Sequence, residues 1–487
     1  MPTPLLPSTS SSRLLAQQAL SRAAGAPLLS GNSVELLIDA AANYAAWLQA
    51  IRGARQRVLL ENYIIRDDTV GREFRDALVE RAQAGVLVVV VVDWLGCLGQ
   101  SRSGFWAPLR AAGGEVRVYN PPQLGQTFGC LSRDHRKSLV VDGTTGFLSG
   151  VCISEKWLGD PARDVPPWRD TGVALRGPVV AELEAAFAQS WGETGAPLAL
   201  LAQAPEPTMP AGEVSLRLIA TQPSSAGMYR LDQLVASLAR QTLWLTDAYF
   251  VGIAPYVQAL LAAARDGVDV RLLVPGSSDI PAVAGLSRAG YRPLLKAGIR
   301  VFEWNGSMLH AKTAVADGQW ARVGSSNLNI ASWLGNLELD VAIEDAGFAS
   351  QLATQYELDL AHATEIVLAP RRRRPGRSEQ VCSSEARPPR VRHGGGSSGR
   401  TAAGALRIAN SVGAALTYRR VLGDTSSTPL FLATLILAAL ALVAILWPAW
   451  IGWPFALLSA WFALNLGIRA WRARRHRQGR QDKPGEA

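Results

Sequence analysis

Six residues with catalytic chemistry fall into a pattern, His-x-Lys-x4-Asp, that occurs twice: His135, Lys137, Asp142, His310, Lys312 and Asp317. The chain has only five histidines in 487 residues, so chance is a poor explanation for two of them in matching motifs. On an extended segment, side chains two residues apart point to the same face, which puts each histidine beside its lysine. One imidazole can attack phosphorus, the other can donate a proton, and the ammonium groups can stabilise the oxygens. The doubled motif therefore predicts an enzyme that moves a phosphoryl group between oxygens.

The segments around each motif also repeat. We expect strand, helix and strand at 57–65, 71–85 and 86–94 in the first half, and at 242–250, 254–267 and 268–276 in the second. A further short strand is expected at 115–120 and at 299–305. Alternating strands and helices predict an α/β fold with a mixed sheet flanked by helices. An internal repeat of this kind predicts two pseudo-symmetric lobes that bring the two histidines face to face.

Composition and charge limit the partners and the cellular compartment that we expect for the protein. The net charge is +9, and arginines gather at 371–374 and in the last twenty residues, which suits an anionic membrane face or, equally, a solvated linker and tail. The four cysteines form no C-x-x-C pair, so reduced thiols and no metal site are expected. The N-terminus lacks a basic segment followed by an apolar core, so no signal peptide is predicted.

The C-terminal part predicts a membrane anchor. Residues 425–468 contain no charged side chain, and 429–447 is almost wholly apolar, which approaches the ~20 residues needed to cross a bilayer. A turn with two tryptophans and a second apolar run complete a hairpin with both ends in the cytosol. The alternative is a buried helical pair of a soluble domain. Residues 403–423 have helical spacing that fits an interfacial helix or, equally, a helix docked on the globular part.

The motifs and their surroundings resemble the phospholipase D superfamily over about residues 30–370, and in detail its bacterial cardiolipin synthase-like members. The supporting segments are 31–39, 60–74, 80–86, 133–143, 168–178 and 323–333. The resemblance implies a phosphohistidine intermediate with no cofactor or metal. His135 is the expected nucleophile and His310 the expected acid, although pseudo-symmetry leaves the two roles exchangeable. Lys137 and Lys312 should bind the phosphoryl oxygens.

The resemblance implies further site residues. Asn327 matches the family asparagine, whereas Cys152 stands at the equivalent place of the first half, where Lys137, a backbone N–H or Ser154 could hold the oxygens instead. Asp170 is expected to orient His135, and Glu338 to orient His310. The motif aspartates Asp142 and Asp317 are expected to bond backbone near the turn that follows them.

Three further expectations concern side chains near the motifs. Glu61 and Asp247 are expected at matching strand positions, where they either line the cleft or make hydrogen bonds at the strand ends. Trp168 is expected to pack rather than to stack on substrate.

The resulting hypothesis is a membrane-anchored phosphatidyltransferase of cardiolipin synthase type. It would move a phosphatidyl group between phosphatidylglycerol molecules, release glycerol, and work at the bacterial inner membrane with cytoplasmic lobes. The alternatives are a phospholipase D that uses water, a nuclease, which the distribution of basic residues disfavours, and a scaffold with a dead site. The expected divisions are an extension 1–30, lobes 31–203 and 204–370, a linker 371–402, a helix 403–423, a hairpin 429–470 and a tail 471–487.

Overall fold

The structure is a computed structural model that describes residues 9–99, 104–122, 132–197, 209–223, 225–368, 419–422, 460–461 and 463–464. The first half contains α1 Thr9–Ala24, β1 Leu29–Ile38, α2 Asp39–Gly53, β2 Arg57–Asn62, α3 Thr69–Gln83, β3 Leu87–Asp93, α4 Ala107–Ala111, β4 Glu115–Tyr119, β5 Lys137–Val141, β6 Thr145–Ser149, the short helices η2 Glu155–Trp157 and η3 Pro161–Arg163, β7 Thr171–Arg176 and α5 Val179–Glu193. The second half contains β8 Val214–Thr221, α6 Gly227–Leu238, β9 Thr242–Thr246, α7 Ala254–Arg265, β10 Asp269–Pro275, α8 Pro281–Lys296, β11 Arg300–Trp304, β12 Thr313–Ala316, β13 Trp320–Gly324, the short helix η4 Ala331–Gly335, β14 Glu338–Ile343, α9 Ala346–Ala361, β15 Ala363–Leu368 and β16 Arg419–Leu422.

Local sequence explains where these elements begin and end. Five consecutive valines form most of β3, which is buried on both faces as a central parallel strand requires. The side chain of Asp68 accepts a hydrogen bond from Gly71 N and caps α3. The predicted strands 57–65 and 242–250 are shorter than expected. Asn62 and Asp247 each accept a hydrogen bond from the backbone N–H two residues later, which turns the chain at both strand ends.

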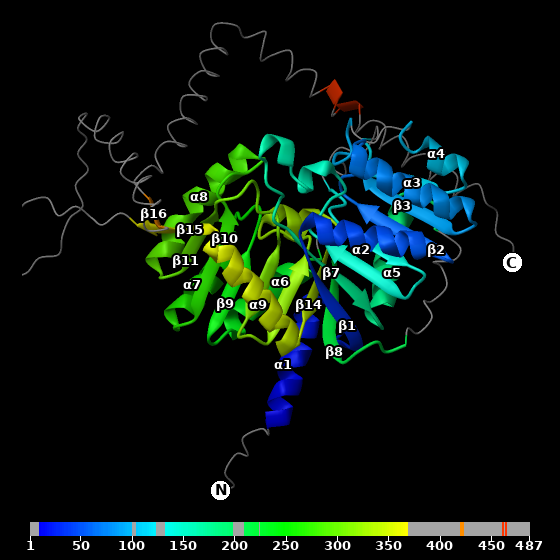
Figure 1. The fold of residues 1–487 in the computed structure, drawn as a ribbon. Helices are drawn as coiled ribbons and strands as arrows, with labels where there is room; N and C mark the ends of the chain where they lie inside the picture. Colours follow the sequence, from blue (N-terminus) through cyan, green and yellow to red (C-terminus); the bar gives the residue numbers. More distant parts are fainter. Residues whose placement is uncertain are drawn as a thin grey trace, which may run out of the picture.

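The strands form one mixed sheet whose order repeats about its centre (Figure 1). Outward from the antiparallel pair of β1 and β8, the first half runs β7-β6-β5-β2-β3-β4 and the second half runs β14-β13-β12-β9-β10-β11. The strands β2, β3 and β4 are mutually parallel, as are β9, β10 and β11, whereas the motif strands β5 and β12 run antiparallel to their neighbours. The predicted α/β fold with mixed strands and a repeated lobe is confirmed.

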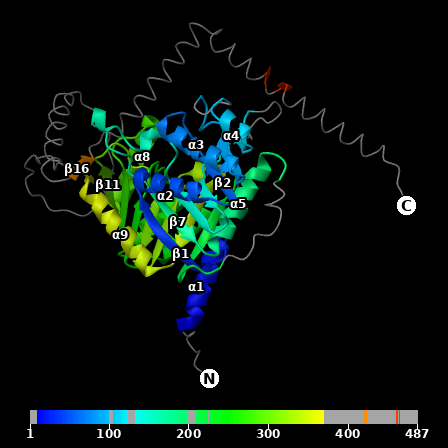
Figure 2. The same ribbon diagram turned by 45° about the vertical axis from the view of Figure 1, so that its right-hand side comes forward.

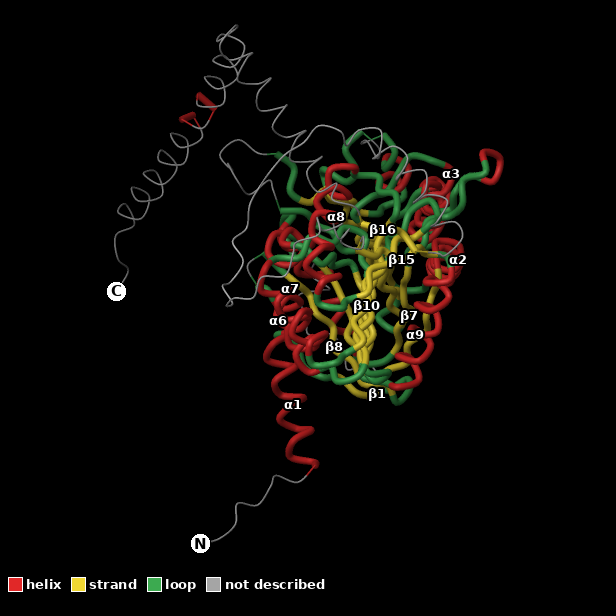
Figure 3. Tube along the Cα trace, turned by 90° about the vertical axis from the view of Figure 1, so that its left-hand side faces the viewer, coloured by secondary structure: helices red, strands yellow, loops and turns green. Residues whose placement is uncertain are grey.

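Helices cover both faces of this sheet. The helices α2 and α9 lie on the same side of the strands (Figure 2), and the edge-on view places α6 and α7 on the opposite side (Figure 3). Each of α5 and α9 contacts strands of its own half and also the first strand of the other half. One buried cluster contains Leu148 and Val173 of the first half together with Val323 and Val341 of the second. The two halves therefore share a core, which fixes the motif strands relative to each other.

The structure describes few of the residues for which C-terminal elements were predicted. Arg419–Leu422 form strand β16, parallel to β15, so the helix predicted over 403–423 is wrong at that end. Backbone N–H and C=O groups at the edge of β15 offer this segment hydrogen bonds that override its helical spacing. In the described part of the chain no helix is both long and apolar enough to cross a bilayer. The predicted hairpin 429–470 lies outside the described residues, except for two pairs of helical residues at 460–464.

Candidate active site

The two motif histidines stand at the starts of equivalent strands. His135 lies two residues before Lys137, which begins β5, and His310 lies three residues before Thr313, which begins β12. Each motif strand is flanked on both sides by other strands, so the sheet holds the start of each motif rigidly.

Each histidine segment also bonds the other half of the chain. His135 N donates to Leu337 O (2.9 Å), and the equivalent His310 N donates to Arg169 O (2.7 Å). These contacts form two parallel bridges, Asp134 with Leu337 and Arg169 with Leu309. The bridges tie each motif to the residue beside the orienting carboxylate of the opposite lobe.

The carboxylates orient the histidines across the lobe boundary. His135 Nδ1 lies 2.9 Å from Glu338 Oε2, and His310 Nδ1 lies 2.7 Å from Asp170 Oδ2. The expected pairing, with each carboxylate serving the histidine of its own lobe, is wrong. Asp170 and Glu338 sit at the starts of equivalent strands, β7 and β14, and the interlobe bridges carry each one past its own motif to the other.

The surroundings of both imidazoles favour the neutral ring, in which one nitrogen carries no proton. Burial lowers the pKa of His135, the lysines nearby lower it further, and Glu338 opposes them. Burial and the Lys312 ammonium lower the pKa of His310 to about 4, against the attraction of Asp170. Burial disfavours the charge on Asp170, but His310, Lys312 and the Thr171 N–H outweigh it and hold its pKa at about 2. An ionised carboxylate at Nδ1 accepts the ring N–H, which leaves Nε2 as the basic nitrogen.

The motif lysines are buried beside their histidines. Lys137 Nζ donates to His135 O (2.5 Å), and Lys312 Nζ donates to His310 O. Lys312 Nζ also lies 2.9 Å from His310 Nδ1. Burial lowers the pKa of Lys312 to about 8, against the attraction of Asp170. Two buried lysine side chains thus lie directly beside the two histidines.

Aromatic rings complete the walls, and sequence reasoning missed their role. Tyr63 packs edge-on against His135 with ring centroids 4.9 Å apart, and Tyr249 packs against His310 at 5.8 Å. Trp157 and Trp168 also contact the His310 ring, at 5.5 and 5.7 Å. Trp168 packs as expected but lines the cavity as well. The repeated position of the two tyrosines after β2 and β9 was the available signal.

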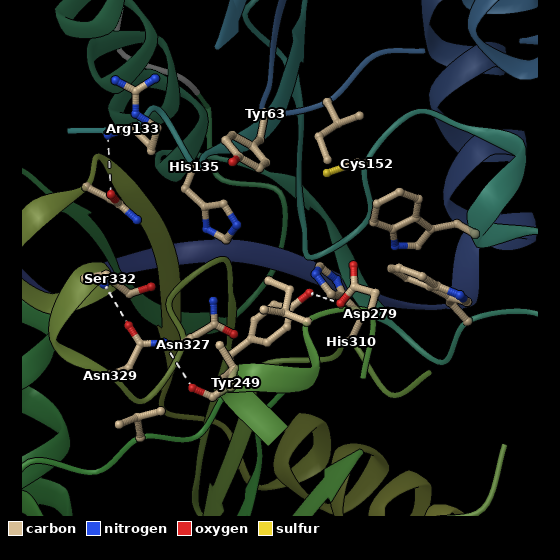
Figure 4. Close-up of a pocket in the computed structure, with 18 of the residues that line it drawn as sticks. Tyr63, Arg133, His135, Cys152, Tyr249, Asp279, His310, Asn327, Asn329 and Ser332 are labelled. Atoms are coloured by element: carbon tan, nitrogen blue, oxygen red, sulfur yellow. Dashed lines mark hydrogen bonds between the residues drawn. The ribbon is translucent and has the colours of Figure 1, made fainter. Parts of the chain in front are cut away.

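His135 and His310 line one cavity of about 530 Å³ (Figure 4). Its wall includes Asn327 from the second half and Cys152 from the first, and both side chains are buried. Asn327 Oδ1 is a buried acceptor that has no hydrogen-bond partner among the described residues. The site is therefore a single chamber that both halves build.

The structure assigns Ser154 a different role from the one suggested for it. Its hydroxyl donates to Asp68 Oδ2 (2.8 Å) and accepts from Lys156 N, so it caps a turn and does not replace the missing asparagine. Cys152 Sγ stands in the wall where Asn327 stands in the other half, and burial raises the pKa of this thiol. The thiol is thus a neutral group that contributes no amide donor.

Glu61 and Asp247 do not occupy matching positions. The strand register aligns Asn62, not Glu61, with Asp247, because Glu61 pairs with Ser138 and Thr246 with the equivalent Thr313. Both carboxylates are fully buried, and neither is among the residues that line the cavity. Asp247 accepts from Leu328 N (2.6 Å) and Tyr249 N, so it fixes the loop that carries Asn327.

The motif aspartates hold the sheet together. Asp142 accepts from the backbone N–H groups of Arg55, Gln56 and Arg57, at the start of β2. Asp317 accepts from three N–H groups at the start of β9 in the same way. Both aspartates bond backbone, as expected. Their partners lie at the start of the neighbouring strand, however, and not in the turn that follows the motif. Both aspartates adopt a positive φ of 53°.

Replacing Asp142 with alanine should destabilise the chain, whereas asparagine should be tolerated better. Alanine loses three acceptor bonds and is strained at positive φ, so we expect the free energy of unfolding to fall by about 2–4 kcal/mol. Asparagine keeps Oδ1 and tolerates this φ, so we expect a loss of about 1 kcal/mol. Urea unfolding of both variants checks this, and equal losses would contradict the hydrogen-bonding role.

Comparison with known proteins agrees with this architecture. The sequence model of a family described as "Cardiolipin synthase, PLD-like domain" matches residues 235–360. A cardiolipin synthase of Alkalihalophilus pseudofirmus is 32% identical over 347 residues, which are 70% of this chain and 68% of that protein. Cardiolipin synthase A of Pseudomonas aeruginosa is 33% identical over 360 residues, covering 73% of this chain and 72% of that protein.

A solved structure supports the fold. The crystal structure of phosphatidylserine synthase from Haemophilus influenzae matches with a TM-score of 0.57 at 15% identity, over 72% of this chain and 92% of that one. The extent and identity of the sequence matches, together with two complete motifs whose histidines line one cavity, lead to one conclusion: this chain belongs to the cardiolipin synthase family of the phospholipase D superfamily.

Proposed function

We propose that the protein is a phosphatidyltransferase that moves a phosphatidyl group from one phosphatidylglycerol molecule to another and releases glycerol. The observation that carries the proposal is the shared cavity, in which His135 and His310 from different halves are each oriented by a carboxylate of the other half. A single phosphorus between the two rings has a nucleophile on one side and a proton donor on the other.

The proposed first half-reaction forms a phosphohistidine. Nε2 of His135 attacks the phosphorus, the bond from phosphorus to the glycerol oxygen breaks, and protonated His310 gives its proton to that oxygen. His135 is the proposed nucleophile because its side chain is the more exposed, 12% against 5% for His310. The low pKa of His310 means that the negative phosphodiester must help it to hold the proton.

The second half-reaction reverses these roles with a lipid hydroxyl. Neutral His310 takes the proton of the incoming hydroxyl, the oxygen attacks phosphorus, and the bond to His135 breaks. Lys137 and Lys312, which are buried beside the histidines, and the side-chain N–H of Asn327, which lines the cavity, would stabilise the phosphoryl oxygens throughout. The carboxylates keep both imidazoles in the reactive tautomer, as in other histidine-dependent transfers.

The lining of the cavity supports a lipid substrate. Ile64, Val251, Val283 and Ile330 line it together with the aromatic rings, and Ile330 is 56% exposed. Apolar side chains at the mouth suit the glycerol and upper acyl region of a phospholipid better than a nucleic acid, whose backbone is charged throughout. We further propose that the apolar segment 429–470 anchors the lobes at the cytoplasmic side of an anionic bacterial membrane, which raises the substrate concentration at the site.

Purified full-length protein in phosphatidylglycerol vesicles tests the function. We expect cardiolipin and glycerol in equal amounts, without added nucleotide or metal. Phosphatidic acid with glycerol, and no cardiolipin, would mean that water is the acceptor and the protein is a phospholipase D. Hydrolysis of single-stranded DNA without lipid turnover would instead indicate a nuclease.

The alkaline side of the pH profile should report Lys312. Its ammonium loses its proton as pH rises through about 8, so kcat/KM should fall above that pH. The acidic limb should report His135, which must be neutral to attack and whose pKa is lowered, so the two limbs are separate. In Lys312→Arg the guanidinium stays charged, so the alkaline limb should move upward even though the rate is lower. An unchanged alkaline limb in that variant would assign it to another group.

A further inference from the structure

An ion pair spans the mouth of the cavity between the two halves. Lys156 Nζ, from η2 of the first half, lies 3.4 Å from Asp279 Oδ2, in the loop between β10 and α8 of the second. Both residues line the cavity that holds the histidines. Their side chains are 38% and 30% exposed, so the pair stands at the entrance and not in the core.

Each member of this pair contacts an aromatic side chain that in turn contacts His310. Lys156 Nζ lies over the ring of Trp168, 4.3 Å from its centroid, and that ring contacts His310. On the other side, Tyr249 OH donates to Asp279 Oδ1 (2.7 Å), and the Tyr249 ring also contacts His310 (Figure 4). The head group of a lipid whose phosphorus lies between the histidines would therefore meet these four side chains.

Proteins bind ammonium ligands over the faces of aromatic rings, and a nearby carboxylate adds Coulomb attraction. Here the protein's own ammonium, Lys156, already fills that place. We propose that Lys156 acts as an internal ammonium that excludes phospholipids with ammonium head groups and leaves Asp279 to accept hydrogen bonds from a neutral polyol head group. The proposal rests on the proposed function and names which donor lipid the same site selects.

The chemistry explains why the selection matters. A donor with an ethanolamine head group could react in the same way: His135 Nε2 would bond phosphorus, the bond to the ethanolamine oxygen would break, and His310 would protonate that oxygen. Nothing in the reaction centre distinguishes ethanolamine from glycerol, because both leave as primary alcohols. Discrimination must therefore come from the part of the head group beyond the oxygen, where Lys156 and Asp279 lie.

Replacing Lys156 with methionine tests the proposal, because methionine keeps the apolar stem and removes the charge. Full-length wild type and Lys156→Met are compared in vesicles of phosphatidylglycerol and phosphatidylethanolamine, and released ethanolamine and glycerol are both measured. Wild type should release glycerol almost alone. In the variant the ratio of ethanolamine to glycerol should rise by about tenfold, the size that a vacated ion-pair and cation–π site supports. Adding Asp279→Asn should abolish the gain.

The control is Lys296→Met, an exposed lysine at the far end of α8, which removes the same charge and so corrects for attraction to anionic vesicles. An unchanged ratio in Lys156→Met would overturn the inference, as would loss of both products, since Lys156 would then be needed for turnover itself. Wild type that releases both alcohols equally would also overturn it while leaving the proposed function intact. No cardiolipin from wild type would instead remove the proposed function.

Discussion

His135→Ala and His310→Ala should each lower cardiolipin formation by about 10⁴-fold or more, because residues that act as a unit each cost nearly the whole rate. The measurement is the initial rate in phosphatidylglycerol vesicles with the full-length protein. The matched control is His362→Ala. This exposed histidine ends α9 and bonds Leu358 O, away from the cavity, so its loss should leave the rate unchanged.

The leaving group separates the two roles. In a phosphatidyl donor whose leaving group is p-nitrophenol, the departing oxygen needs no proton. A variant that lacks only the acid should then release one equivalent of nitrophenol in a fast burst, because only the second half-reaction still needs His310. A variant that lacks the nucleophile should show no burst. With His135 as the nucleophile, the first half-reaction of His310→Ala should be rescued by about 10²-fold or more and that of His135→Ala should not. Rescue of His135→Ala alone would exchange the two assignments, and rescue of neither would contradict the division of labour.

Removing either orienting carboxylate should cost almost as much as removing a histidine. In Glu338→Gln and Asp170→Asn, an amide replaces the acceptor at Nδ1 and favours the wrong tautomer, so we expect a loss of about 10³–10⁴-fold in kcat. Protein folding should survive, because the amides preserve the volume of the side chains. A similar change at Glu182, which is exposed on α5, serves as the control and should have no effect.

The same nitrophenyl donor tests the crossed pairing. Since Asp170 orients His310, Asp170→Asn should be rescued as His310→Ala is, and Glu338→Gln should behave as His135→Ala does. Pairing within each lobe would give the opposite pattern, with Glu338→Gln rescued and Asp170→Asn not. The result therefore distinguishes the observed arrangement from the one that the family resemblance implied.

Several features of the site could be predicted because they depend on short stretches of chain. The valine run of β3, the strand periods around the motifs and the His-x-Lys spacing are local patterns, and strand geometry alone places each lysine beside its histidine. The duplication predicted two equivalent lobes, and the order of strands about β1 and β8 confirms them. The ends of β2 and β9 were less predictable. Asn62 and Asp247 end these strands by accepting hydrogen bonds from backbone N–H groups that would otherwise continue the pairing with neighbouring strands.

By itself the sequence determined the chemical groups, their local spacing and the presence of two equivalent halves, since backbone periodicity encodes all three. Only the tertiary structure decided which carboxylate serves which histidine and that Lys156 meets Asp279, residues that lie more than a hundred positions apart. Asp170 and Glu338 are chemically alike and stand at equivalent strand starts, so both pairings satisfy the linear pattern equally. The choice between them is made by the way β1 and β8 join the halves, because that packing carries each carboxylate across the boundary.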